Sequence, residues 1–374
     1  MEKKKKKKNS NKLNLIICAI AFVFMLVYVY FVDGFDNIVS SIQQINVGFL
    51  LVAMLLMVVY WTMEALQLHA VLQTLSPGQK FYKSLIVAIL GQYFNCITPS
   101  STGGQPMQAY YFSKFGVPLS NGVAALLSRF IVYQFVLTVY SVFVLLIRFN
   151  SFSEQFAPLM FLVMVGFAIN TLVIVFLIML AFFRAPVRKL AGWIIKLLGK
   201  LRIFKTQEVV DDRTAQVNEI IDQYHENFNF IKRKPWLIIR MIFYTVIQLT
   251  AYFSISYVIY LGFGLSGTDY LTIISCQAFV LMISGFVPLP GALGAAEGSY
   301  TMFFGDIFRK GTHSFVGIST FIWRFLTFYL PIIVGLVISL FLGKVMKIAR
   351  PDDEETDDKP IELTAEELAG DSVD

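Results

Sequence analysis

The sequence predicts an all-α polytopic integral membrane protein with two inverted repeats, built from about six full transmembrane helices and two re-entrant hairpins of broken helix. The chain of 374 residues is 56% hydrophobic and only 15% charged, whereas about 25% of the residues in a water-soluble domain are charged. Several apolar runs approach the roughly 20 residues that a helix needs to cross a bilayer. The period-two alternation of a lipid-facing β-barrel does not occur, which favours helices.

Six apolar runs are predicted as full spans, namely 13–32, 47–75, 120–149, 157–183, 236–262 and 315–343. The first run follows six lysines, as a signal peptide does. However, it is longer than the usual apolar region of a signal peptide, and "YVYFVDGFDN" offers no small-x-small cleavage site. We therefore expect it to be retained as the first span.

Two further apolar regions, 82–115 and 270–308, are interrupted by proline and glycine. The first contains "NCITPSSTGGQPMQAYYF" and the second contains "GFVPLPGALGAAEGS". The arms of the first region have about 14 and 12 residues and reach only about 20 Å as helices, too short to cross. We expect the first region, and less directly the second, to form a hairpin that enters and leaves the membrane on one side.

The basic residues predict the topology. They gather before the first span, in the segment 184–234 and after the last span, whereas the loops 33–46 and 150–156 have no Lys or Arg. Because cytoplasmic loops are enriched in Lys and Arg, both termini are predicted to be cytoplasmic in the plasma membrane. Arg309 and Lys310, placed outside, are the exception. The net charge of +6 is expected to contact anionic lipid rather than nucleic acid.

The same charges divide the chain into four parts. We predict a basic cytoplasmic N-terminus (1–12), a first membrane repeat (13–149), a second membrane repeat (150–345) and an acidic, disordered cytoplasmic tail (346–374). The second repeat carries a cytoplasmic insert at 184–234, where "PVRKLAGWIIKLLGKL" places its apolar residues on one helical face. Such a pattern is typical of a helix that lies at the membrane surface.

Each broken region is followed by a long span that bears one arginine. Arg129 follows the first break in "LLSRFIVYQF", and Arg324 follows the second in "TFIWRFLTFY". Because each half has an odd number of full crossings, the second half is inverted relative to the first, as in many transporters. Irregular backbone at membrane depth is tolerated only where protein or water satisfies it, so the breaks are predicted to border an enclosed polar cavity.

The charged residues within the spans are the first candidate site residues. A buried arginine is costly and usually has a partner or a role. Arg129 and Arg324 could bind a lipid phosphate with two parallel hydrogen bonds, or they could form structural salt bridges to Glu64 or Glu297. The two carboxylates could instead carry a proton or bind a lysyl amine of a headgroup. The sequence leaves these alternatives open.

The first break supplies the other candidates. A helix that begins here would offer hydroxyl caps and N–H groups to a lipid phosphate, or the segment could be a packed turn without a ligand. Its residues are Ser100, Ser101, Thr102, Gly103, Gly104 and Gln105, and the counterparts in the second break are Pro290 and Gly291. We expect no catalytic residue, no metal and no cofactor, because no catalytic triad, phosphate-binding loop or metal-ligand spacing occurs.

The signature "ITPSSTGGQPMQAYYFSKFGV", the later "PLPGALGAAEGS" and the arginine after each resemble the transmembrane region of lysylphosphatidylglycerol synthases, also called the flippase-like family, over about 13–345. The resemblance implies a membrane unit that translocates aminoacylated lipid. In bifunctional members a separate soluble domain attaches lysine to phosphatidylglycerol, and here the chain ends soon after the last span.

We therefore predict a flippase of the plasma membrane for a phospholipid, such as lysyl-phosphatidylglycerol or another polar-headed lipid. One alternative is phosphatidylglycerol lysyltransferase, as the family label implies, although we expect no soluble catalytic domain. A second alternative is a non-transporting membrane partner of an envelope enzyme. The expected partners are the phospholipid substrate and a bilayer with anionic lipids, and a homo-oligomer is possible.

Overall fold

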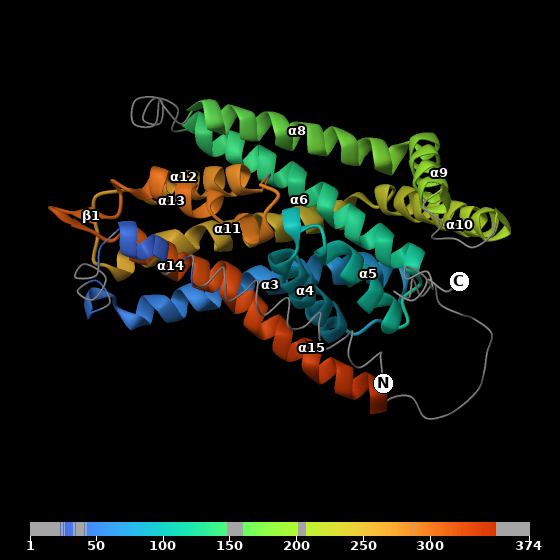
Figure 1. Ribbon diagram of the computed structural model, residues 1–374, viewed down its shortest axis with the longest axis horizontal. Coiled ribbons are helices and arrows are strands. Elements are labelled where there is room, and N and C mark those ends of the chain that lie inside the picture. Colours follow the sequence, from blue (N-terminus) through green and yellow to red (C-terminus); the bar gives the residue numbers. More distant parts are fainter. Residues whose placement is uncertain are drawn as a thin grey trace, which may run out of the picture.

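Long helices run side by side along the longest axis of the protein, which we describe from a computed structural model (Figure 1). The structure describes residues 43–147, 160–200, 207–285 and 287–348, together with 23, 25, 27–32, 34 and 41. The long helices of this bundle include α3 (Val47–Leu75), α6 (Leu119–Ile147), α8 (Met160–Phe182), α11 (Pro235–Gly262) and α15 (Leu330–Ile348). Within the described residues, five helical stretches are long and apolar enough to cross a membrane: Val47–Leu75, Leu119–Ile147, Phe161–Met179, Pro235–Gly262 and Val316–Leu342. The prediction of an all-α polytopic membrane protein is confirmed.

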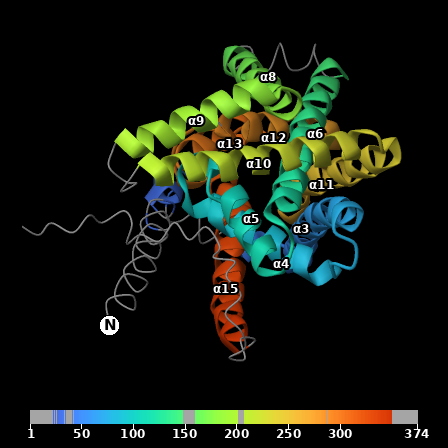
Figure 2. The same cartoon turned by 90° about the vertical axis from the view of Figure 1, so that its right-hand side faces the viewer.

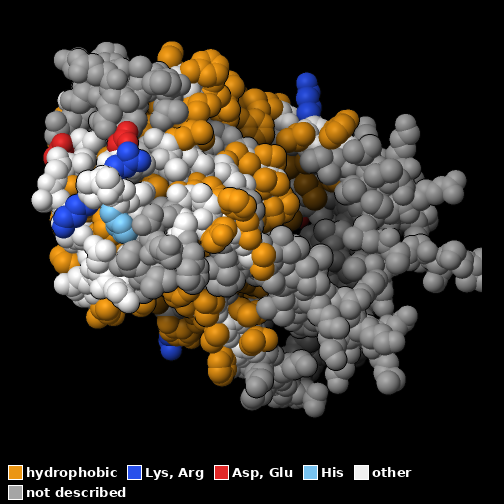
Figure 3. Space-filling model, turned by 60° about the vertical axis from the view of Figure 1, so that its left-hand side comes forward, with side chains coloured by type: hydrophobic (Ala, Val, Ile, Leu, Met, Phe, Trp, Pro, Cys, Tyr) orange, Lys and Arg blue, Asp and Glu red, His pale blue; other side chains and the backbone are white. Residues whose placement is uncertain are grey.

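The outer surface of these helices is apolar. Side chains such as Leu55 on α3, Phe143 on α6, Phe161 on α8 and Phe341 on α15 are more than half exposed. Figure 3 shows hydrophobic side chains over much of the described surface, with most of the visible charged side chains at the left of the view. A surface of this kind is stable in hydrocarbon and would aggregate in water.

Each broken region folds as two short helices around a single turn. The first comprises α4 (Phe81–Ile97), the turn η1 (Pro99–Ser101) and α5 (Gly104–Lys114). The second comprises α12 (Tyr270–Ser284), the turn η3 (Pro290–Ala292) and α13 (Ala295–Phe304). In Figure 1, α4 and α5 lie toward the end that carries α9 (Arg184–Lys200) and α10 (Gln207–Lys232), whereas α12 and α13 lie toward the end that carries β1 (Arg309–Lys310).

The predicted insert at 184–234 contains two helices, α9 (Arg184–Lys200) and α10 (Gln207–Lys232). They lie against each other across one end of the bundle (Figure 2). The apolar face of α10 is buried against α6 through side chains that include Ile221, Tyr224 and Phe228. Burial raises the pKa of the Tyr224 hydroxyl well above its ordinary value, so this tyrosine stays neutral. The α10 face therefore packs on protein.

The predicted last span, 315–343, differs from a simple helix. It consists of α14 (Val316–Arg324), the π-helical segment η4 (Phe325–Tyr329) and α15. A π-helical turn inserts an extra residue into a helix and is frequent at functional sites. It begins directly after Arg324 and changes the direction in which the following side chains project.

The structure contains a short pair of strands that the sequence did not predict, and it describes only part of the predicted first span. The loop before α14 contains the two-residue strands β1 (Arg309–Lys310) and β2 (His313–Ser314), paired antiparallel, which an all-α prediction omits. Of the predicted first span, 13–32, only residues 23, 25 and 27–32 are described, and they are helical. The predicted N-terminus (1–12) and the tail from 349 onward lie outside the described residues.

Candidate functional site

The two turns of the broken regions resemble each other at their first and third residues and differ elsewhere: Gly291 also has positive φ (58°), and Leu293 is extended (φ −51°, ψ 136°) where Thr102 is helical (φ −81°, ψ −18°). Each begins with proline after an extended residue: Thr98 has φ −111° and ψ 146°, and Leu289 has φ −112° and ψ 150°. Each ends in a residue with positive φ, Ser101 at 52° and Ala292 at 53°, and within the described residues these are the only non-glycine residues with positive φ. Positive φ is costly for residues other than glycine and is found mostly at functional sites.

The same turns meet inside the molecule. Although η1 and η3 are nearly 200 residues apart in sequence, they are in direct contact. The helix α4 contacts both of them. Two turns that share a proline start and a positive-φ residue are therefore packed against each other.

Side chains of α4 hold the first turn. The hydroxyl of Thr98 accepts a hydrogen bond from the Gly103 N–H (2.9 Å), and the Asn95 Oδ1 accepts one from the Gly104 N–H (3.1 Å). A Cβ at Gly104 would lie 2.7 Å from the backbone oxygen of Gly91, so only glycine fits this close approach. These two N–H groups, which were predicted as possible donors to a lipid phosphate, are hydrogen-bonded within the protein.

The first arginine, Arg129 on α6, lies beside the carboxylate of Glu64 on α3. Its Nη2 is 3.4 Å from Glu64 Oε1, and both side chains are buried. Glu64 also accepts hydrogen bonds from Gln92 on α4 (2.6 Å) and from Gln108 on α5 (3.0 Å). One carboxylate therefore links four helices, and it has two good donors besides the arginine.

Arg129 itself is poorly satisfied. Its Nε is buried and has no hydrogen-bond partner within the described residues. At 3.4 Å the contact with Glu64 is a loose ion pair, longer than the 2.7–2.9 Å of a strong charged hydrogen bond. The guanidinium group can therefore accept another anion.

The second arginine, Arg324, is tightly held. Its Nε donates to Glu297 Oε1 at 2.7 Å, and its Nη2 donates to the carbonyl oxygens of Gly291 (2.9 Å) and Ala292 (3.4 Å). The other oxygen of Glu297 accepts the Gly294 N–H at 2.7 Å and so caps α13. This arginine fixes the second turn to α13 and has a structural role.

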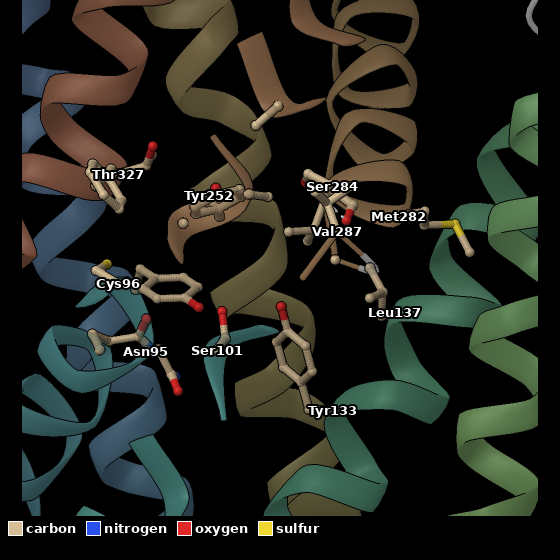
Figure 4. A pocket seen from close by; sticks show the side chains of 18 of the residues that line it. Asn95, Cys96, Ser101, Tyr133, Leu137, Tyr252, Met282, Ser284, Val287 and Thr327 are labelled. Carbon is tan, nitrogen blue, oxygen red and sulfur yellow. Dashed lines mark hydrogen bonds between the residues drawn. The ribbon is translucent and has the colours of Figure 1, made fainter. Parts of the chain in front are cut away.

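A cavity of about 320 Å³ lies between these groups. Its lining comes from α3, α4, η1, α5, α6, α8, α11, α12, η3, α13, α14 and η4. In Figure 4 the hydroxyl groups of Ser101 and Tyr133 point toward the same space, near Tyr252 and Asn95. The volume is at the small end of the range of about 300–1,000 Å³ for ligand pockets, so it suits a headgroup rather than a whole lipid.

The predicted site residues divide into two groups. Five line the cavity: Arg129, Arg324, Ser101, Gln105 and Gly291. Six do not line it: Glu64, Glu297, Thr102, Gly103, Gly104 and Pro290. Glu64 and Glu297 nevertheless form ion pairs with the two arginines. They therefore act on the site through the arginines and do not line the cavity themselves. Ser100 lies in η1, and its side chain is outside the description.

Several polar residues of the cavity were not predicted. Those with amide or hydroxyl groups are Tyr60, Gln92, Asn95, Tyr133, Gln134, Asn170, Tyr252, Ser284 and Thr327. Helical spacing from an identified residue could have found some of them, since Tyr133 follows Arg129 by one turn and Tyr60 precedes Glu64 by one turn. Gln92, Asn95, Asn170, Tyr252 and Ser284 come from helices that carry no charged candidate, so only the fold reveals them.

Comparison with known proteins gives the family. A family model described as "Lysylphosphatidylglycerol synthase TM region" matches residues 16–335. The chain belongs to this family. The resemblance found in the sequence is confirmed, and the protein is a multi-pass membrane protein.

Two relatives of this family member carry general names. One is a "UPF0104 membrane protein" of Archaeoglobus fulgidus, 25% identical over 316 residues, which cover 82% of this chain and 92% of the relative. The other is an "Uncharacterized protein MG306 homolog" of Mycoplasma pneumoniae, 25% identical over 291 residues, which cover 72% of this chain and 70% of the relative. Their names assign no substrate.

Proposed function

We propose that this protein moves a polar-headed phospholipid between the two leaflets of the cell membrane. The observation that carries the proposal is that two arginines, one after each of two matching turns, line a single polar cavity inside an apolar bundle. A headgroup would enter this cavity while its acyl chains stay in the bilayer. The cavity contains hydrogen-bonding groups that replace the water lost by the headgroup.

Arg129 binds the lipid phosphate in this proposal. Its Nε lacks a partner within the described residues, and its ion pair with Glu64 is long. A phosphate can accept two parallel hydrogen bonds from a guanidinium group, which a lysine cannot supply. Arg324, whose charge is compensated by Glu297, keeps the second turn in shape.

We infer that the two halves are inverted repeats with re-entrant hairpins, and that both termini are cytoplasmic. The matching turns of η1 and η3, and the approach of their hairpins from opposite ends of the bundle, support this topology. Under the proposal, rocking of one half against the other around the shared cavity exposes the headgroup site to each leaflet in turn.

Reconstituted flipping tests the function. Purified protein in liposomes should move fluorescent phospholipid between leaflets, and Arg129→Lys should reduce the rate by about tenfold while the folded yield stays unchanged. Arg240→Lys, at an exposed arginine on α11, is the matched control and should have normal activity. A normal rate in Arg129→Lys would exclude the phosphate role.

The same preparation discriminates the two alternatives. A phosphatidylglycerol lysyltransferase would form labelled lysyl lipid from lysyl-transfer RNA and phosphatidylglycerol. A non-transporting partner of an envelope enzyme would leave both leaflets unchanged and form no product. Lipid movement without product formation is the expected result.

Cysteine labelling tests the topology. In a variant without native cysteines, single cysteines would replace Lys80 and Ser113 at the two ends of the first hairpin, and Ser266 and Lys310 beside the second. All four positions are exposed. Lys80→Cys and Ser113→Cys should react only from the cytoplasm, and the other two only from outside. Reaction of the two ends of one hairpin from opposite sides would contradict a re-entrant arrangement.

A further inference from the structure

The charged residues that line the cavity have one sign. Among the described residues of its wall, Arg129 and Arg324 are the only ones with a charged side chain, and the wall contains no Asp, Glu or Lys. This observation bears on the substrate, because a carboxylate best replaces the lost hydration of an ammonium group. Aromatic rings can also bind a cation, but Trp323 and Phe328 in this wall already face the guanidinium group of Arg324.

Glu64 does not line the cavity, and both of its carboxylate oxygens accept hydrogen bonds. One of its oxygens accepts from Gln108 and lies near Arg129, and the other accepts from Gln92 at 2.6 Å. Gln92 lines the cavity whereas Glu64 does not. The carboxylate is therefore covered by an amide, and a bound headgroup would contact that amide.

Glu297 is also engaged. Its Oε1 accepts from Arg324 at 2.7 Å, and its Oε2 accepts from the backbone N–H of Gly294 at 2.7 Å. Releasing this carboxylate toward a lysyl amine would break the cap of α13 and leave Arg324 without its counter-ion. An amine in the cavity would thus meet two arginines and no available carboxylate.

Unused hydrogen-bond donors point to an anion. Arg129 Nε and Trp323 Nε1 are both buried without a partner within the described residues. Both residues line the cavity, but the two nitrogen atoms are covered by protein, so a ligand reaches them only when the side chain moves. A phosphate oxygen is an acceptor for such groups. The remaining polar wall is made of neutral amides and hydroxyls, which suit the hydroxyl groups of an uncharged headgroup.

We infer that the cavity selects a lipid with one phosphodiester charge and an uncharged, hydroxylated remainder, such as phosphatidylglycerol, and disfavours the aminoacylated lysyl form. This inference rests on the proposed function, because it specifies which headgroup the same cavity accepts. The added ammonium of the lysyl form places a third positive charge beside the two arginines.

The experiment compares lipids in one preparation of the full chain. Proteoliposomes would contain fluorescent phosphatidylglycerol or fluorescent lysyl-phosphatidylglycerol at equal mole fraction, and the rate of transfer between leaflets would be measured for each. Phosphatidylglycerol should move at least about tenfold faster, a ratio that a modest difference in binding free energy provides. Native mass spectrometry of the purified protein with both lipids present should show the same order of occupancy.

A charge placed in the wall should change the preference. Gln134→Glu adds a carboxylate to the cavity and should bring the two rates within about threefold of each other, by slowing phosphatidylglycerol and favouring the lysyl form. Asn229→Asp, on the exposed surface of α10, is the matched control and should leave the wild-type ratio unchanged.

Each result has a distinct meaning. Equal or faster movement of the lysyl lipid in the wild-type protein would overturn the inference while leaving the flippase proposal intact. Movement of neither lipid would overturn the flippase proposal itself. Glycerol 3-phosphate in solution should not slow transfer. Binding of this soluble phosphate at the Arg129 site, without movement of either lipid, would assign the cavity to a soluble phosphate and overturn the lipid assignment.

Discussion

Removing the side chain of Arg324 should destabilise the protein far more than removing that of Arg129. The two arginines are at similar positions in sequence after their breaks and are equally buried. They differ in what their loss leaves behind. In Arg324→Met, Glu297 retains only the Gly294 N–H as a hydrogen-bond donor within the described residues. In Arg129→Met, Glu64 retains two amide donors.

The structure gives a size to each effect. Breaking a buried ion pair by removing one partner costs about 3–5 kcal/mol, because the remaining charge is uncompensated. We expect this cost for Arg324→Met, which also removes hydrogen bonds to the carbonyl oxygens of Gly291 and Ala292. For Arg129→Met we expect about 1–3 kcal/mol, the range for weakening a buried polar contact whose other partners persist.

The assay is unfolding in mixed micelles of dodecylmaltoside and sodium dodecyl sulfate, followed by tryptophan fluorescence. Arg240→Met, at an exposed site, is the control and should change the free energy of unfolding by no more than about 0.5 kcal/mol. Adding Glu297→Gln to Arg324→Met should recover part of the lost stability. Removing both charges of a buried ion pair costs less than removing one and leaving the other uncompensated. An Arg324→Met variant as stable as Arg240→Met, or one more stable than Arg129→Met, would refute the reasoning.

Three further predictions concern the turns and the insert. Gly291→Ala should cost more stability than Gly294→Ala by about 1–3 kcal/mol, because both residues have positive φ but only a Cβ at Gly291 collides with the ring of Phe328. Equal losses of stability in the two variants would contradict this. Gly294→Ala alone should lose about 1–3 kcal/mol from backbone strain, measured by the same unfolding assay. Asn121→Ala should speed tryptic cleavage within α10, because Asn121 joins the end of α3 to Asn227 through hydrogen bonds of 3.1 and 2.8 Å; unchanged cleavage would show that apolar packing alone holds the insert.

Much of the fold follows from the sequence because lipid imposes one rule on every span. A helix must satisfy its own backbone and present apolar side chains over a fixed length. The predicted span 47–75 is therefore found as α3, and 236–262 is found one residue longer as α11. The π-helical conformation after Arg324 could not be predicted in this way, because the sequence of that segment is as apolar as that of its neighbours. It depends on how α14 and α15 pack, which no local pattern encodes.

The candidate site was predictable where charge made it conspicuous. Arginine and glutamate are expensive at membrane depth, so Arg129, Arg324, Glu64 and Glu297 could be identified one by one. Which carboxylate serves which arginine could not be predicted, because Glu64 and Arg129 meet only when α3 packs against α6. Neutral residues such as Tyr252 are tolerated in many spans, so composition alone does not mark them as part of the cavity.

The two arginines differ in how tightly their carboxylate partners hold them. This difference suits a site that must bind a phosphate and then release it. A phosphate that draws Arg129 away from Glu64 breaks a 3.4 Å contact, and the carboxylate remains compensated by Gln92 and Gln108. Binding therefore needs little reorganisation, and release returns the arginine to a waiting counter-ion. If Arg129 were held as Arg324 is, binding a ligand would first require breaking strong charged hydrogen bonds. Under the proposed function, the loose pair is the adaptable part of the cavity and the tight pair is its fixed frame.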